Sequence, residues 1–259
     1  MSNGNFINEG REEEQPVSGS SSSQRVGECR RLVARRYLDE KYISPDEVDP
    51  STGFMNANID PYAGHSEYFW TLNDSHEVEA TIRVIKHPSG ITKGWRFPLQ
   101  REFSIEDETQ EYIDYFNHFH PESIIEISGL AEQKNADEFA SLDMYRRFWQ
   151  HAKRSNYNVC LVSADERLDK KLNVMFGQAI RQVGDSKFVM GSQTVPSLLF
   201  PDQCVKAMSD IYQNKLEQEG ERSAASYKAL FMYLTDGLEI DYFTNEEKFY
   251  IHRMGINID

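Results

Sequence analysis

The sequence has little that would indicate a secreted or membrane-spanning protein. Its 259 residues include three cysteines, Cys29, Cys160 and Cys204, with no CxxC spacing. An odd number of cysteines without that spacing favours reduced thiols in the cytoplasm over a disulfide framework. No run of about 18 apolar residues is present, and the amino-terminal region is polar and acidic rather than basic and then apolar. We therefore expect no transmembrane segment, no signal peptide and a cytoplasmic location.

Several ligand-binding motifs are also missing. There is no GxGxxG and no GxxxxGK[ST], which excludes the two standard nucleotide-phosphate loops. The 7 histidines are scattered, and the close pair His118 and His120 is expected in a surface loop from Asn117 to Pro121 rather than in a metal site. We predict neither a bound metal nor a resident cofactor.

Positive charge is scarce relative to negative charge. The chain has 28 Lys and Arg against 42 Asp and Glu, for a net charge of -14. A field of that sign repels phosphate backbones, so we do not expect nucleic acid as the main partner unless a local basic patch overrides the net charge. Hydrophobic residues at 39% suffice for a packed interior, and the length fits one domain with additions at its ends.

The amino-terminal part divides into three stretches. Residues 1–24 are polar and carry a serine run, so we expect a disordered leader that cannot bury enough apolar surface to fold. A helix is predicted from Val26, because apolar residues recur there at spacings of three and four. The stretch 44–64 is rich in Pro, Asp and Asn and should be an irregular segment packed over another element.

The centre of the chain alternates between strand and helix patterns. Residues 67–73 and 78–84 read as two strands joined by a tight turn, with apolar and polar side chains alternating along the second. Together with the later elements, this order predicts a mixed α/β layer architecture. The later predicted elements are a helix near 105–116, a strand at 123–130, a helix containing Leu142 and Trp149, a strand at 158–163, a helix at 168–176 capped by Gly177, strands at 180–183 and 194–200, and a mostly helical stretch from 204 to 259.

Glu126 is the most unusual residue of the predicted strands, because it lies among isoleucines. In a strand it shares one face with Ile124 and Ser128. Two interpretations stay open from position alone. Either this is the solvated face of an edge strand, or Glu126 is a general base whose pKa is raised by apolar neighbours and which takes a proton from an amine.

Arg83 also has two interpretations. It shares a strand face with Thr81 and Glu79. Its guanidinium either holds a substrate carboxylate through two hydrogen bonds or pairs with Glu79 on a wet sheet face. Cys160 and Cys204 have no histidine in a recognisable partner motif, so we interpret both as buried structural thiols.

The order of these elements resembles a known family. The chain is similar to the acyl-homoserine-lactone synthases and the related N-acyl amino acid synthases, which have the GNAT (N-acetyltransferase-like) fold. The resemblance covers roughly Cys29 to Ile211 and implies a mixed central sheet flanked by helices. Its motifs are Ala34-Arg-Arg-Tyr37, His65 to Trp70, Asn73-Asp74, Ile82-Arg-Val-Ile85 and Ile125-Glu-Ile-Ser128.

The resemblance implies a set of site residues. In that family the substrate cleft is formed by an arginine of the first helix, acidic residues of the following loop, a strand arginine and the glutamate of an E-x-S-R motif. The matching residues here are Arg36, Asp60, Arg83 and Glu126. Within the loop, Asp46 or Asp49 is an alternative to Asp60.

The match fails at the end of the E-x-S-R motif, where Gly129 replaces the arginine. This departure disfavours lactone formation from S-adenosylmethionine. The acetyl-CoA members of the fold carry a glycine-rich pyrophosphate loop before the next helix, whereas residues 131–137 contain no glycine. We therefore expect an acyl group carried on acyl carrier protein rather than on CoA.

Docking of an acidic carrier protein requires a positive patch on this acidic chain. The helix after Asp137 offers such a patch, to which Arg30, Arg31, Lys170 and Lys171 would add; ordinary solvated helix faces are the alternative. The predicted carrier-docking residues are Arg146, Arg147, Lys153 and Arg154.

The resemblance thus predicts an N-acyltransferase that moves a fatty acyl group to the amine of an amino acid or related metabolite. Glu126 would accept the amine proton, backbone N–H groups from Ser128 to Leu130 would stabilise the oxyanion, and Arg83 and Arg36 would hold the acceptor carboxylate. Phe139, Tyr145 and Trp149 would line an acyl tunnel, and plain core positions are the alternative for each of them.

Three alternatives stay open at this point. The first is an acyl-homoserine-lactone synthase, the second a CoA-dependent acetyltransferase of the same fold, and the third a protein that binds acyl carrier protein or lipid without catalysis. In every case we expect an N-acyltransferase-like domain over residues 25–211 and a helical carboxy-terminal extension over 212–259.

Overall fold

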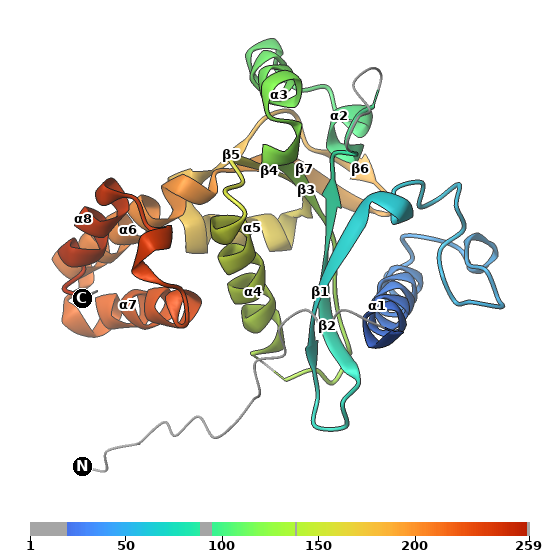
Figure 1. The fold of residues 1–259 in the computed structure, drawn as a ribbon, viewed down its shortest axis with the longest axis horizontal. Helices are drawn as coiled ribbons and strands as arrows, with labels where there is room; N and C mark the ends of the chain where they lie inside the picture. Colours follow the sequence, from blue (N-terminus) through green and yellow to red (C-terminus); the bar gives the residue numbers. More distant parts are fainter. Residues whose placement is uncertain (1–19, 89–94, 138, 258–259) are drawn as a thin grey trace.

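A mixed seven-stranded sheet forms the centre of the protein (Figure 1). The structure is a computed structural model in which residues 20–88, 95–137 and 139–257 are described. The strand order is β1-β2-β3-β4-β7-β5, and β6 pairs with β7. This architecture confirms the predicted α/β fold. The strands are β1 (Ser66–Leu72), β2 (Val78–Lys86), β3 (Ile124–Glu132), β4 (Val159–Asp165), β5 (Ile180–Gln182), β6 (Lys187–Val189) and β7 (Ser192–Leu199).

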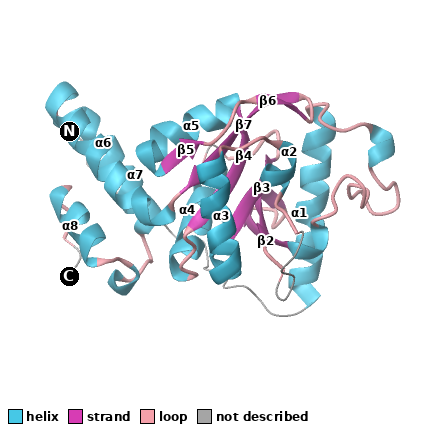
Figure 2. Cartoon of the chain, turned by 90° about the horizontal axis from the view of Figure 1, so that it is seen from above, coloured by secondary structure: helices cyan, strands magenta, loops and turns pink. Residues whose placement is uncertain are grey.

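Helices cover both faces of the sheet (Figure 2). On the first face, α1, α2 and α3 pack on β2, β3 and β4. On the second face, α4 packs on β1 and β2, and α5 packs on β4, β5 and β7. A carboxy-terminal group of three helices, α6 to α8, lies against α4 and α5. The helices are α1 (Ser20–Asp39), α2 (Pro98–Glu102), α3 (Asp107–Phe119), α4 (Ala140–Arg154), α5 (Glu166–Phe176), α6 (Cys204–Glu219), α7 (Glu221–Thr235) and α8 (Asn245–Arg253).

The start of α1 differs from the prediction. The helix begins at Ser20, so residues 20–24 of the predicted leader are helical. Residues 1–19 lie outside the described part of the chain, and the prediction of a disordered leader is not tested there. The buried face of α1 is the predicted one, with Cys29, Leu32 and Val33 in the core.

The region before β3 also differs from the prediction. α3 continues to Phe119, so His118 is helical rather than in a loop, and His120 directly follows the helix. Within the described ranges, no three His, Cys, Asp or Glu side chains gather as metal ligands. No described helix is long and apolar enough to cross a bilayer.

β2 is buried on both faces, which corrects the wet-face interpretation of Arg83. Its alternating polar residues Glu79, Thr81 and Arg83 are as buried as the apolar residues between them. The reason is that α1 and the irregular segment after it cover this face. Glu79 does not pair with Arg83 but accepts a hydrogen bond from the backbone N–H of Asp137 at 2.6 Å.

The pairing of β3 with both neighbouring strands changes near its middle. Its parallel pairing with β4 runs from Ile124 to Ile127 and stops there. On the other side the register with β2 shifts, so that Gly129 and Leu130 together lie opposite Ile82. This arrangement is a β-bulge, and Gly129 adopts a φ of +71°, a conformation that an arginine would adopt only with strain. The family's arginine is therefore replaced by a residue that suits the backbone of the bulge.

Candidate active site

Glu126 is buried on the first face of the sheet, with 1% of its surface exposed. The backbone N–H of Leu99, in α2, donates a hydrogen bond to Glu126 Oε2 at 3.0 Å. Burial raises the pKa of the carboxyl to about 8, although the Leu99 N–H and the charge of Arg83 oppose the rise. The solvated-edge interpretation is therefore wrong, and Glu126 can bind or release a proton close to neutral pH.

Arg83 forms a buried ion pair with Asp60. Arg83 Nη2 lies 2.5 Å from Asp60 Oδ1, and both side chains are at most 5% exposed. Arg83 Nε donates to Ser66 Oγ at 2.8 Å, and the Ser66 hydroxyl donates to the carbonyl of Tyr62 at 2.8 Å. Among the described residues, the Nη1 group of Arg83 makes no hydrogen bond.

The structure distinguishes between the three candidate aspartates of the loop. Asp60 lies against Arg83, whereas Asp46 is exposed beside Ser44 and Asp49 accepts hydrogen bonds from Ser51. Asp60 is thus the aspartate that the fold brings to the strand arginine. Ser66 was not predicted as a site residue, although it lies within the motif from His65 to Trp70.

The aromatic side of α1 closes this cluster. Tyr37 is partly buried, and desolvation of its hydroxyl raises the pKa of that group. It lies close enough to Arg83, Asp60 and Glu126 for their charges to act on that pKa. Arg36, its neighbour, is placed differently from the prediction. Its guanidinium pairs with Asp39, the last residue of α1, and with Glu40, which follows the helix, so the structure does not bring Arg36 into contact with Arg83 or Asp60.

A narrow apolar pocket lies on the second face of the sheet, between the strands and helices α4 and α5. It encloses about 580 Å³ of empty space, part of which is open to solvent. Tyr145 and Trp149 line it as predicted, but Phe139 is 54% exposed and does not. The remaining lining residues are Ile82, Ile127, Ser128, Gly129, Leu130, Phe148, Val162, Ser163, Leu168, Leu172, Phe176 and Leu199.

The polar end of the pocket coincides with the separation of β3 from β4. Ser128, the adjoining bulge residue Gly129 and Ser163 of β4 line it there. The Ser163 hydroxyl is near enough to Glu126 to lower the pKa of the carboxyl, yet its oxygen is buried without a well-formed hydrogen bond. Ser163 thus lies between Glu126 on one face and the pocket on the other. Sequence reasoning missed it, although a serine ending an apolar strand was the available signal.

The predicted docking residues of α4 are engaged within the protein. Arg146 donates to the carbonyl of Asp236 and pairs with its carboxylate, and Arg154 donates to the carbonyl of Gly237. Lys153 Nζ lies 2.7 and 2.9 Å from the two carboxylate oxygens of Glu247, and both side chains are buried. These contacts join α4 to the carboxy-terminal helices. Arg146, Lys153 and Arg154 thus have partners within the protein, and carrier docking by these residues and Arg147 stays a prediction.

Comparisons with known proteins show which solved structures share the fold of this chain. No protein-family model and no curated protein matches the chain. Among solved structures, FeeM, an N-acyl amino acid synthase from uncultured soil microbes, matches with a TM-score of 0.53 and 11% identity over 74% of this chain and 92% of FeeM. BjaI, a CoA-dependent acyl-homoserine lactone synthase, matches with a TM-score of 0.54 and 12% identity over 76% of this chain and 86% of BjaI.

A third structure, the acyl-homoserine-lactone (AHL) synthase LasI, matches with a TM-score of 0.50 and 14% identity over 71% of this chain and 87% of LasI. At these identities the likeness concerns the fold. The chain therefore has the fold shared by the N-acyl amino acid synthases and the acyl-homoserine-lactone synthases, which is the fold that its sequence motifs predicted.

Proposed function

We propose that the protein is an N-acyltransferase that moves a fatty acyl group from a thioester to the amine of an amino acid or a related small metabolite. The observation that carries the proposal is the position of Glu126. Its carboxyl has a pKa of about 8 and lies beside the Arg83–Asp60 pair, where the separation of β3 from β4 leads to an apolar pocket. The shared fold with known acyl-transferring synthases supports the same conclusion.

The chemistry follows from these positions. The neutral amine attacks the thioester carbonyl carbon, a C–N bond forms, and the carbonyl oxygen becomes an oxyanion near the bulge of Ser128 to Leu130. The Glu126 carboxylate accepts the proton that the nitrogen loses, with Ser163 on the path between them. Collapse of the intermediate breaks the C–S bond, and the thiolate takes that proton to give an amide and a free thiol.

The acceptor is held, in this proposal, by the Arg83 group. Asp60 and Ser66 orient the guanidinium and use its Nη2 and Nε donors, which leaves Nη1 for the carboxylate of an amino acid. Asp60 also neutralises Arg83 before substrate arrives, so the buried arginine is never an unpaired charge. The expected product is an N-acyl amino acid with a free carboxylate.

The loop between β3 and α4 favours a carrier-protein donor over CoA. Two of its backbone N–H groups are already bonded to carboxylates, since Asp137 N donates to the Glu79 carboxylate and Phe139 N to the Asp137 carboxylate. A pyrophosphate bound there would compete with two carboxylates of the protein itself and would be repelled by them. A donor whose phosphopantetheine arm enters from a protein docked outside avoids this loop.

The docking surface moves from α4 to α5 in this proposal. Lys170 and Lys171 are exposed on α5, the same helix whose Leu168 and Leu172 line the pocket. An acidic carrier protein bound to these lysines would lie beside the pocket that receives its acyl chain.

The test is a product assay of the purified chain by mass spectrometry. It uses acyl carrier thioester or acyl-CoA with either an amino-acid mixture or S-adenosylmethionine. We expect an N-acyl amino acid from the carrier thioester. A lactone made from S-adenosylmethionine would overturn the acceptor assignment. If neither mixture gives an acylated product, whether the thioester is hydrolysed or left intact, the proposed function is wrong.

A further inference from the structure

We propose that Trp149 is the floor of the apolar pocket and that the carboxy-terminal helices behind it set the longest acyl chain the protein accepts. The inference rests on the proposed function, since it treats the pocket as an acyl site. It gives the carboxy-terminal group, α6 to α8, a role in substrate selection.

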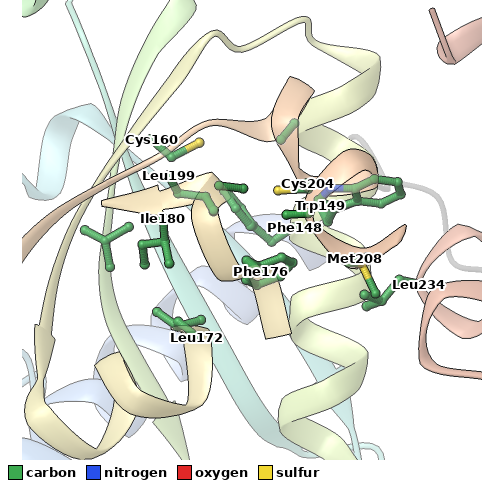
Figure 3. Close-up of a cluster of buried hydrophobic side chains, with 14 of the residues drawn as sticks. Phe148, Trp149, Cys160, Leu172, Phe176, Ile180, Leu199, Cys204, Met208 and Leu234 are labelled. Carbon is green, nitrogen blue, oxygen red and sulfur yellow. The ribbon is translucent and has the colours of Figure 1, made fainter. Parts of the chain in front are cut away.

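Trp149 lies between the pocket and the carboxy-terminal helices. It lines the pocket together with Phe176 and Leu199, yet it is 2% exposed and its ring centroid lies 6.2 Å from that of Phe243, which follows α7. Figure 3 shows Trp149 beside Cys204, with Met208 and Leu234 close by. One continuous apolar cluster therefore runs from the pocket through Trp149 into the interior of the carboxy-terminal group.

Hydrogen bonding of the indole N–H does not explain why Trp149 occupies this position. The indole Nε1 is buried and, among the described residues, has no well-formed hydrogen-bond partner. It lies beside the Cys204 thiol, where it opposes the rise in thiol pKa that burial causes. A buried donor without a good partner destabilises the fold. The role of Trp149 therefore lies in the size of its ring, which separates the pocket from the apolar interior of the carboxy-terminal group.

Hydrogen bonds and an ion pair to the carboxy-terminal part of the chain fix the segment of α4 that carries Trp149. Gln150 Nε2 donates to the carbonyls of Leu234 and Asp236 at 3.0 and 2.8 Å. One helical turn after Trp149, Lys153 forms the buried ion pair with Glu247, whose carboxylate also accepts the backbone N–H of Thr244 at 2.8 Å. These contacts prevent α4 from moving away from the sheet when a longer chain enters.

Removal of the ring would lengthen the pocket instead of exposing it to water. The side chains beyond it are apolar and fully buried, so the new space would join the pocket as a dry extension. The residues that would line this extension are Cys204, Met208, Phe231 and Leu234.

The experiment measures binding of saturated fatty acids of increasing length, by displacement of a fluorescent fatty acid from the full chain. For wild type, affinity should rise about fourfold with each methylene and stop rising at a defined length. In Trp149→Ala the rise should continue to longer chains, again about fourfold for each methylene that newly fits. Trp149→Phe, a smaller change, should extend the limit less and serves if the alanine variant fails to fold.

Two controls separate the inference from the proposed function. Phe249→Ala removes a ring that is 63% exposed on α8 and should leave the length limit unchanged. If wild type shows a limit and folded Trp149→Ala and Trp149→Phe keep the same limit, the floor assignment is wrong while the acyl site stands. If wild type binds no fatty acid of any length, the acyl site itself is wrong, and the inference falls with it.

Discussion

The two faces of the central sheet carry opposite chemistry. On the first face, under α1 and α2, the buried groups include Glu126, Arg83 and Asp60. On the second face, under α4 and α5, the buried groups that line the pocket are almost all apolar. The two sets approach each other where β3 leaves β4, between Glu126 and Ser163. In the proposed function, this arrangement would keep a charged acceptor and an apolar acyl chain on opposite faces of the sheet until they meet at that point.

The largest expected effect comes from removing the base on the polar face. Glu126→Gln keeps the shape and the hydrogen bond from Leu99 but cannot take a proton. Acyl transfer should fall by about two to four powers of ten, the range for a lost general base. Single-turnover assays with acyl carrier thioester measure the effect, and circular dichroism should show an unchanged fold. Ser197→Ala, a buried hydroxyl on β7 of the same sheet, is a matched control that should keep most of the activity.

The next effect concerns the ion pair on the same face. Asp60→Ala leaves the Arg83 guanidinium buried without its partner, and breaking a buried pair in this way costs about 3 to 5 kcal/mol. Urea denaturation measures the loss. The exposed pair Arg253–Asp210 is the control, because Asp210→Ala should change stability by less than about 1 kcal/mol. Equal losses in the two variants would contradict the distinction between a buried pair and a surface pair.

The smallest expected effect concerns the exposed lysines of α5, the helix that lies over the second, apolar face of the sheet. Reversing the charge of Lys170 and Lys171 should weaken binding of acyl carrier protein and reduce its salt dependence, without loss of stability. Reversing Arg146 and Arg154 should instead lower the melting temperature, because those residues hold the carboxy-terminal helices. Binding by surface plasmon resonance at two salt concentrations, with thermal melts of the same samples, compares the two pairs. A carrier-binding defect in the Arg146 and Arg154 variant alone would return the docking surface to α4.

Local pattern predicted the elements well, because each depends on residues near in sequence. The alternation around Ile82 predicted β2, and the helical spacing before Trp149 predicted α4. Glu126 was recognisable because a carboxylate among isoleucines needs a special environment. Asp60 was selected through the family resemblance, since the loop before β1 offers three aspartates with no pattern to separate them.

Tertiary contacts explain what the sequence did not predict. The basic residues of α4 looked like a solvated face because their partners, among them Asp236 and Glu247, lie far along the chain. The bulge at Gly129 depends on the register between β2 and β3, which one strand alone does not specify. Arg36 pairs with its own helix neighbours, a choice that periodicity leaves open.

The pH dependence of acyl transfer tests the central claim most directly. The claim is that the ionised Glu126 carboxyl on the first face accepts the proton of the amine that attacks the acyl group held on the second face. Burial holds the pKa of this group near 8, so the active carboxylate form increases as pH rises through that value. We predict that kcat/KM of wild type rises with an apparent pKa of about 8, and that Glu126→Gln is much slower and retains only the titration of the acceptor amine. A Glu126→Gln profile with the same inflection and the same turnover as wild type would contradict the account.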